Sequence, residues 1–221
     1  MSGWEWWLKS DAGLAARIAV GLVILGTLAT VDLKRHGQRA TRWREYLFLL
    51  AAVLLAMGYG VVNDWLASGI SWEYFYYGKG LDQQLGPHVP PDPAALRWAA
   101  CLIGLKSTWS AGLVIGVALL IANNPRRGRL RLPYQSLLGL LPPILLIAAG
   151  SAAVGAIIGS HGWLAWTNRD LRVLMRDNLF RPRAFMTAYG MNLGGYAGGL
   201  LATALATIWI VRNRWRPTNE H

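Results

Sequence analysis

Charged residues are scarce in this sequence. They make up only 15% of its 221 residues, whereas 54% are hydrophobic. A soluble domain normally carries roughly 25% charged residues. The charges that are present gather in a few segments and leave long uncharged stretches between them. This composition excludes an ordinary soluble fold and predicts a chain that is partly surrounded by lipid.

Residues that hold metals and cofactors are also few. The single cysteine, Cys101, lies in an apolar stretch, which excludes an intramolecular disulfide and a site with several cysteines. The four histidines, His36, His88, His161 and His221, all lie outside the predicted spanning helices, so a haem held by two helix histidines is not expected. There is no His-Glu-x-x-His pair and no P-loop. We expect no metal and no cofactor, and the chain carries no catalytic motif.

Long apolar runs, by contrast, are plentiful. Five segments have the polarity and the length, about 20 residues, of helices that span a bilayer. They predict an all-α bundle of about five transmembrane helices, a single transmembrane domain over residues 1–221. Pro142 and Pro143 predict a kink in the fourth helix, because each removes a backbone donor. The expected helices cover residues 12–31, 45–64, 96–122, 132–159 and 185–211.

The net charge of +11 is unevenly distributed. Residues 32–45, 126–131 and 212–220 lie on one side of the predicted bundle and together hold twelve cationic and three acidic residues, a net of +9, whereas the opposite side holds eight of each sign. The positive-inside rule therefore predicts an N-terminus outside and a C-terminus in the cytosol. The excess positive charge is then explained by the orientation of the helices in the membrane and by attraction to anionic inner-leaflet lipids. Nucleic acid is therefore not an expected partner.

The first predicted helix shares some features with a cleaved signal peptide, because Lys9 and Arg17 precede a short apolar core. Two acidic residues, Glu5 and Asp11, also precede this core, however, and Lys34 follows it closely. Positive charge directly after the apolar core hinders translocation. We therefore expect the segment to be retained as a spanning helix.

Two outer connections, residues 63–95 and 160–187, are long enough to have structure of their own. Residues 72–77 are nearly all aromatic, which favours a short strand or an interfacial layer. This aromatic segment is interpreted either as a cap on the headgroup region or as a platform that closes over a site in the bundle. In the second connection, leucines at helical spacing predict an amphipathic interfacial helix, in which Arg172 and Arg176 hold lipid phosphates or a partner.

A short part of the sequence resembles a known group of proteins. The run GYGVVNDW, followed by SWEYFYYGKGL, places an Asn-Asp pair at the end of a helix and an acid-Tyr-Phe run after it. This arrangement resembles a segment of uncharacterised bacterial multi-pass membrane proteins. The resemblance covers about 25 residues and implies the bacterial cytoplasmic (inner) membrane, with no activity to carry over.

Polar residues inside the predicted spans are the most informative ones. Lys106 lies about 13 Å along its helix from Arg97, a depth at which an ammonium costs about 3 kcal/mol. Asn192, Ser151 and, where the second helix runs on, Asp64 lie at a comparable depth. Such groups usually face the bundle interior or a hydrated cavity. We therefore predict a polar layer in the outer half of the bundle.

Two interpretations of this layer are open. In the first, Lys106 extends towards the outer headgroups and Asn192 links two helices. In the second, Lys106 pairs with Asp64 or Glu73 and faces a cavity open to the periplasm. The candidate ligand-binding residues are Asp64, Glu73, Tyr74, Lys106 and Asn192. The candidates in the outer connections are His88, His161, Arg172 and Arg176.

Glycines at a spacing of four residues predict close helix contacts in the same region. The pairs are Gly155 and Gly159 on the fourth helix, and Gly194 with Gly198 and Gly195 with Gly199 on the fifth. Small residues at this spacing allow two backbones to approach.

These patterns favour a membrane protein whose outer face binds a partner or a small or lipidic ligand. A first alternative is a transporter or channel component that uses the polar layer around Lys106. At this length, such a component requires a homo-oligomer or a membrane-protein partner, and its sequence shows no internal repeat. A second alternative is a membrane-embedded enzyme that uses Asp64, Glu73 and either His88 or His161.

Overall fold

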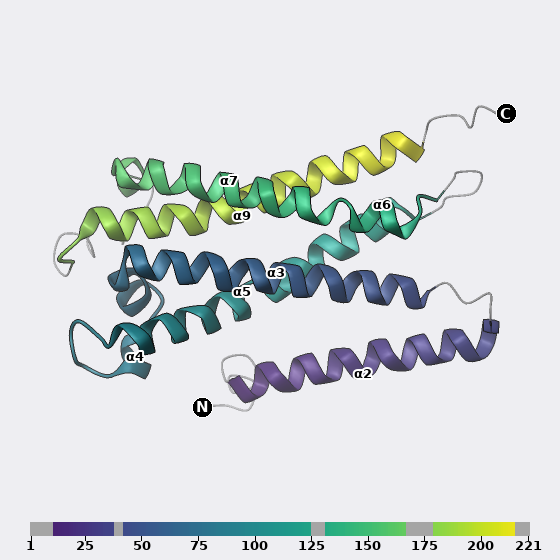
Figure 1. The fold of residues 1–221 in the computed structure, drawn as a ribbon, viewed down its shortest axis with the longest axis horizontal. Helices are drawn as coiled ribbons and strands as arrows, with labels where there is room; N and C mark the ends of the chain where they lie inside the picture. The colour runs from purple at the N-terminus through teal and green to yellow at the C-terminus, as the bar shows by residue number, and fades with distance from the viewer. Residues whose placement is uncertain (1–10, 38–41, 125–130, 167–178, 215–221) are drawn as a thin grey trace. The chain divides into compact units, whose positions relative to one another are not determined.

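The structure is a computed structural model that describes residues 11–37, 42–124, 131–166 and 179–214. Every regular element within these residues is helical (Figure 1). Five of the segments are long and apolar enough to cross a membrane, which confirms the prediction of a helical bundle with five spans. These are α2 (Asp11–His36), α3 (Trp43–Ile70), α5 (Pro93–Ala122), α6 (Tyr134–Leu138) together with α7 (Leu141–Ser160), and α9 (Pro182–Arg214).

The chain divides into two compact units, residues 1–51 and 52–221, so the boundary falls within α3. In the first unit, Asp32 near the end of α2 is buried. Its carboxylate accepts the backbone N–H of Arg42 at 3.0 Å and contacts Nδ1 of His36 at 3.0 Å. Asp32 thereby ties the end of α2 to the residue that precedes α3. All the features discussed below lie in the second unit.

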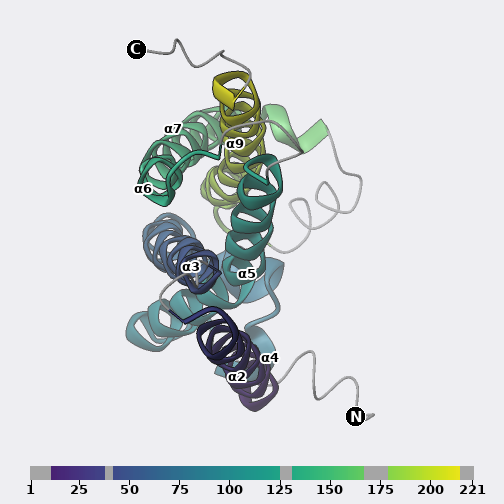
Figure 2. The same ribbon diagram turned by 90° about the vertical axis from the view of Figure 1, so that its right-hand side faces the viewer.

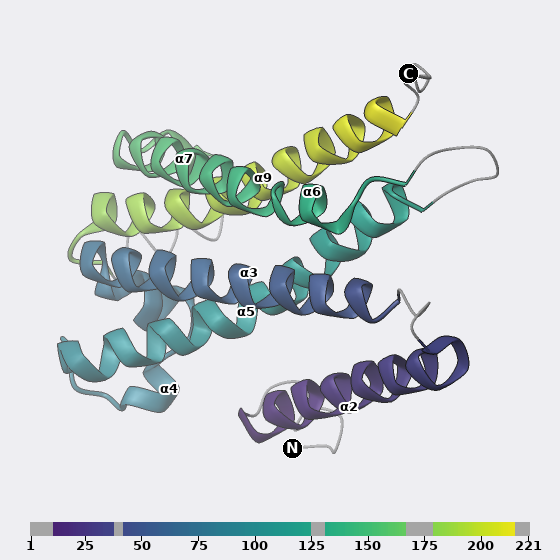
Figure 3. The same cartoon turned by 45° about the vertical axis from the view of Figure 1, so that its right-hand side comes forward.

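Helices α3 and α5 cross with their backbones in contact (Figure 3). A Cβ atom added to Gly60 would collide with the main chain at Gly104, and one added to Gly104 would collide with Gly60. Farther along α5, a Cβ on Gly112 would lie 2.7 Å from the carbonyl oxygen of Ala52. Glycine thus sets the separation of these two helices.

Helices α7 and α9 lie next to each other (Figure 2), and their backbones are also in contact. A Cβ on Gly155 would meet the carbonyl oxygen of Gly190, and one on Gly159 would meet that of Met186. On α9, a Cβ on Gly194 would meet the carbonyl oxygen of Ser151. The predicted close contact between the fourth and fifth spans is confirmed for this set of glycines.

The fourth span is interrupted near its start, where a kink was predicted. Helix α6 ends at Leu138 and α7 begins at Leu141, with Pro142 and Pro143 in its first turn, where the missing backbone donors have no helical partner to lose. Asn123, just after α5, donates to the Leu132 carbonyl at 3.0 Å and accepts the Leu132 N–H at 2.9 Å. This pair of bonds joins the end of α5 to the start of the fourth span.

The aromatic segment predicted as a strand or an interfacial layer forms no strand. It contains a π-helical turn, η2 (Tyr74–Gly78), which is followed by the short helix α4 (Asp82–Leu85). The side chains of Tyr74, Phe75 and Tyr76 are at most 5% exposed. Tyr74 and Phe75 join α5 and α9 residues in one apolar core, with the Tyr74 ring edge-on to Phe185 at 5.5 Å. The segment is therefore part of the protein core, because α9 offers an apolar surface that the sequence of the loop does not reveal.

Candidate functional site

Asp64 is the most unusual polar residue in the described part of the chain. Helix α3 continues to Ile70 rather than ending at residue 64, so Asp64 lies inside a spanning helix and is only 2% exposed. Its Oδ1 accepts a hydrogen bond from the Asn63 amide at 3.1 Å. Its Oδ2 is buried with no hydrogen-bond partner among the described residues. Buried polar atoms are almost always partnered, so this oxygen requires an explanation.

Asp64 borders a small polar hollow between α3, α5 and α9. The hollow has a volume of about 10 Å³. A second buried atom without a described partner, the hydroxyl oxygen of Tyr59, lies at the same place. The Ser107 and Thr108 hydroxyls donate to the Gly104 carbonyl at 3.1 and 2.7 Å. The residues that line the polar hollow are Tyr59, Gly60, Asn63, Asp64, Ser107, Thr108, Asn192, Gly195 and Tyr196.

Asn192, on α9, is one of the residues that the sequence placed in the polar layer. It is buried beside Asp64, and its amide donates to the Ala188 carbonyl one helical turn earlier at 3.3 Å. The cation whose charge acts on Asp64 is Lys79, whose ammonium also lies 5.5 Å from the centre of the Tyr74 ring. The structure thus brings Asp64 and Asn192 together, as the predicted layer requires.

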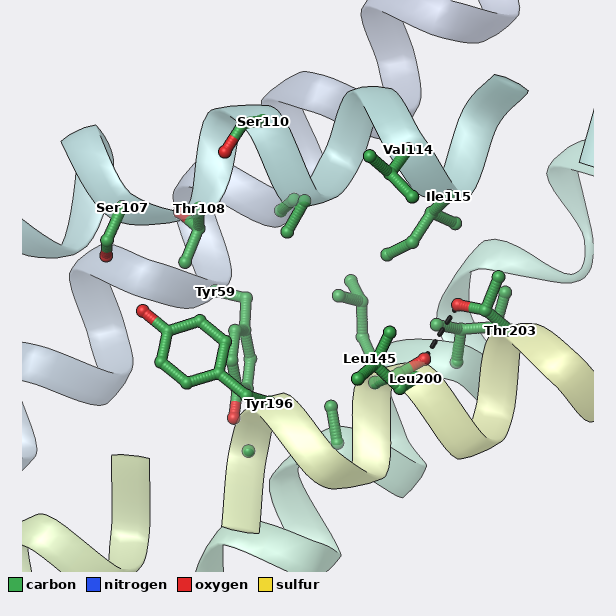
Figure 4. Close-up of a pocket in the computed structure, with 16 residues that line it drawn as sticks. Tyr59, Ser107, Thr108, Ser110, Val114, Ile115, Leu145, Tyr196, Leu200 and Thr203 are labelled. Carbon is green, nitrogen blue, oxygen red and sulfur yellow. Dashed lines mark hydrogen bonds between the residues drawn. The ribbon is translucent and has the colours of Figure 1, made fainter. Parts of the chain in front are cut away.

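A larger apolar cavity adjoins the polar hollow and shares five lining residues with it. Its volume is about 390 Å³, within the range of roughly 300–1,000 Å³ that is usual for ligand pockets. In Figure 4, hydroxyl-bearing residues such as Tyr59, Tyr196 and Thr108 lie towards one end of this cavity. The other end is lined by the apolar side chains of Val114, Ile115, Leu145 and Leu200, together with Thr203, whose hydroxyl donates to the Gly199 carbonyl at 2.7 Å.

The apolar cavity exists because small residues surround it on three helices. Ala111, Ala148 and Gly199 leave space that larger side chains would fill. A Cβ added to Gly199 would meet nothing within 4 Å, in contrast to the crowded glycines at the α7–α9 contact. Two lining residues, Val114 and Leu200, are 61% and 71% exposed. The cavity is therefore open on the side where α5 and α9 would face lipid.

Glu73, another predicted candidate, has a clear structural partner. Its side chain is 0% exposed, and its carboxylate accepts the backbone N–H of Phe180 at 2.6 Å and that of Arg181 at 3.0 Å. These two groups directly precede α9, where backbone donors lack helical partners and a negative charge is favoured. Glu73 thus anchors the start of α9 to the aromatic segment, and it does not border the polar hollow.

Tyr74 and Lys106 lie near the site without lining it. Burial raises the pKa of the Tyr74 hydroxyl well above its usual value, and the negative charge of Asp64 raises it further. Lys106 is half-buried on α5, next to Ser107, and has an interaction of its own within the chain. Neither residue is among those that line the polar hollow or the apolar cavity. The pairing of Lys106 with a carboxylate remains a prediction.

The two outer-loop candidates that the structure describes, His88 and His161, do not line this site. His88 and His161 are exposed, and His161 Nδ1 lies 2.8 Å from the Ile157 carbonyl at the end of α7. Arg172 and Arg176, with the predicted amphipathic helix, lie outside the described residues. Within the described ranges no three His, Cys, Asp or Glu side chains are grouped so that they could hold a metal ion.

Sequence reasoning missed the two tyrosines of the site. Tyr59 and Tyr196 stand in apolar helices, where tyrosine is common enough to attract no notice. Their phenol oxygens become significant only because the crossing of α3 and α9 brings them beside Asp64. The spacing of Gly195 and Gly199 was a usable signal, but it indicated a helix contact rather than a hollow.

The site therefore combines a buried acidic end with an apolar body, and it is assembled from four helices that are far apart in the sequence. The acidic end can accept hydrogen bonds, and the apolar body can hold a hydrocarbon chain. Comparison of the chain with protein-family models, with curated proteins and with solved structures gives no match.

Proposed function

We propose that this protein binds an amphipathic, lipid-like ligand, with the ligand's polar head in the polar hollow and its hydrocarbon part in the apolar cavity. The observation that carries the proposal is that the two spaces lie side by side and share five lining residues, Tyr59, Ser107, Thr108, Gly195 and Tyr196. A polar ligand alone would leave the cavity of about 390 Å³ empty. A purely apolar ligand would leave the Asp64 and Tyr59 oxygens without partners.

The charge distribution supports a place for the polar hollow in the outer half of a bacterial cytoplasmic membrane. The basic segment around residues 32–45 precedes α3 and is cytosolic by the positive-inside rule. Asp64 lies close to the opposite end of α3, which ends at Ile70. With the N-terminus outside and the C-terminus inside, the polar head would lie nearer the periplasm. The open side of the cavity would admit the ligand laterally from the bilayer.

A cavity-filling variant tests this proposal. Gly199→Leu adds a side chain where a Cβ meets nothing, so the variant should fold while its cavity is occupied. Gly150→Leu is the matched control, because Gly150 also has open space at its Cβ but does not line the cavity. The probe is an alkanol that carries a diazirine near its chain terminus, incorporated into lipid nanodiscs with the purified protein and photoactivated.

We expect the probe to label cavity residues such as Leu145 and Ile115 in the wild-type protein and in Gly150→Leu. Labelling of these residues should fall at least about tenfold in Gly199→Leu, as for a lost pocket contact of 1.4 kcal/mol or more. Labelling that simply follows lipid exposure, with the exposed Leu146 modified most and Gly199→Leu unchanged, would contradict the proposal.

Transport is a second candidate, favoured by the discontinuous fourth span. Interrupted helices are typical of transporter binding sites, and Ile144 and Leu145 of the first turns of α7 line the cavity. On this alternative, proteoliposomes should move a labelled amphiphile between leaflets faster than empty liposomes do. Equal rates with intact probe labelling would leave binding as the function and exclude transport.

A further inference from the structure

We infer that the polar head of the ligand is a primary amine, whose ammonium group occupies the polar hollow between Asp64 and Tyr59. This inference rests on the proposed function, because it assigns the chemistry of the head to the same site. It is carried by three properties of the hollow: its charge, its hydrogen-bonding character and its size.

The charge of the hollow calls for a cation. The Asp64 carboxylate is 2% exposed, and only Oδ1 has a hydrogen-bond partner among the described residues. Burying a carboxylate is costly unless it is paired and hydrogen-bonded. None of the residues that line the hollow is cationic. Lys79 acts on Asp64 through its charge but leaves Oδ2 without a hydrogen bond.

Two amides that line the hollow are donors: Asn63 donates to Asp64, and Asn192 donates to the Ala188 carbonyl and also interacts with Asp64. The hydroxyl groups around the hollow supply acceptors. The Ser107 and Thr108 hydroxyl hydrogens are directed at the Gly104 carbonyl, so their oxygens can offer the hollow only lone pairs. Asp64 Oδ2 is an acceptor when ionised, and the Tyr59 hydroxyl can accept as well. An ammonium group has three donors and no acceptor, so it matches this set.

The size of the hollow limits the head to a small group. Its volume of about 10 Å³ is close to the space that one water molecule needs, roughly 10–15 Å³. An –NH3+ group is of this size. A trimethylammonium, a phosphate or a sugar is much larger and would require α3, α5 and α9 to separate. Because Gly60 and Gly104 hold α3 against α5 backbone to backbone, that separation is opposed.

Competition against the diazirine alkanol tests the inference. Decylamine, decanol and decyltrimethylammonium are compared in nanodiscs at matched mole fractions in the bilayer. We expect decylamine to halve the labelling at a concentration about tenfold lower than decanol does, as for a charge-assisted hydrogen bond. Decyltrimethylammonium carries the same charge but does not fit the hollow, so it should compete no better than decanol.

Two variants locate the preference. Asp64→Asn keeps the side-chain shape and removes the charge, so the tenfold difference between decylamine and decanol should disappear. Tyr59→Phe should reduce the difference without abolishing it. The ranking of the three competitors in the wild-type protein remains decisive even where a variant does not fold.

The outcomes separate this inference from the proposed function. Equal competition by decylamine and decanol, with labelling still lost in Gly199→Leu, would overturn the amine head and leave amphiphile binding standing. Equal competition by decylamine and decyltrimethylammonium would also overturn it, because membrane charge alone would then explain the preference. Labelling that no competitor reduces and Gly199→Leu does not change would overturn both.

Discussion

The two faces of α9 use the same residue type to opposite effect. On the face towards α7, Gly190 and Gly194 lie so close to the main chain of α7 that a single added carbon would collide with a carbonyl oxygen. On the neighbouring face, Gly199 has open space, and a Cβ on Gly195 would meet the Tyr59 side chain and, at 3.6 Å, the Ala152 Cβ. One face closes a helix contact and the other borders a cavity.

This difference shows that a small residue in a spanning helix lets two helices approach closely only where the backbone of the second helix faces it. In a bilayer, helices associate through van der Waals packing and polar contacts rather than through the hydrophobic effect. Where α7 faces α9, the missing side chains are replaced by main chain. Where α3, α5 and α7 diverge around Gly199, nothing replaces them, and a cavity remains.

The largest loss of stability is expected at the face of α9 that contacts α7. Gly155→Ala places a methyl group against the Gly190 carbonyl, which cannot move without moving α9. Overpacking of this kind costs about 1–3 kcal/mol. Gly150→Ala on the same helix meets nothing and should be neutral or slightly stabilising. Thermal unfolding in nanodiscs measures both, and equal midpoints for the two variants would show that the contact is not closed.

A loss of stability of similar size is expected where α9 begins, because the start of α9 sets which of its faces meets α7. Glu73→Ala would leave two backbone donors, Phe180 N–H and Arg181 N–H, without the buried carboxylate that accepts them, at a cost of about 1–3 kcal/mol. Asp92, which accepts the Ala95 N–H at 2.8 Å at the start of α5, is exposed and serves as the control. Asp92→Ala should cost about 1 kcal/mol or less.

The two caps also differ in what they control. Glu73→Ala should shift the rotation of α9 and therefore reduce probe labelling in the cavity, whereas Asp92→Ala should not. Equal destabilisation by the two substitutions, with labelling unchanged in both, would mean that Glu73 does not fix the start of α9.

The sequence predicts the fold well and the site only in part. Apolar length and the positions of polar residues were sufficient for the five spans and for placing Asp64 and Asn192 at one depth. The sequence leaves the end of α3 open between residue 64 and a later residue, because the polar Asn63 and Asp64 interrupt the apolar run. The burial of residues 74–76 depends on the apolar start of α9, about 110 residues later in the chain.

The cavity was beyond sequence reasoning for a physical reason. A hollow is defined by the crossing of helices, and Gly195 and Gly199 carry the same spacing as the glycines that close the other contact. The partners of Glu73 could not be predicted either, because they are backbone N–H groups and nearly every residue has one. The polar residues of a site are thus visible in advance, whereas the space between them is not.

The smallest expected effect is on the pH dependence of folding stability, and it reports on the charge of Asp64 at the acidic end of the site. Burial and the charge of Asp64 raise the pKa of Tyr74 above that of an unfolded tyrosine, about 10. The folded state therefore holds the Tyr74 proton more tightly than the unfolded state does. The resulting stability is fully present below pH about 10 and is lost as the pH rises above it.

Tyr74→Phe removes this titration, so its unfolding midpoint should decline less steeply above pH about 10 than that of the wild-type protein. The pKa of Tyr77 is also raised, first by burial, but its side chain is more exposed than that of Tyr74, so Tyr77→Phe should change the slope less. Because the charge of Asp64 contributes to the Tyr74 shift, Tyr74 should ionise at a lower pH in Asp64→Asn than in the wild-type protein. An alkaline slope that Tyr74→Phe changes and Asp64→Asn does not would show that Asp64 carries no charge next to Tyr74, and the acidic end of the cavity would then be neutral.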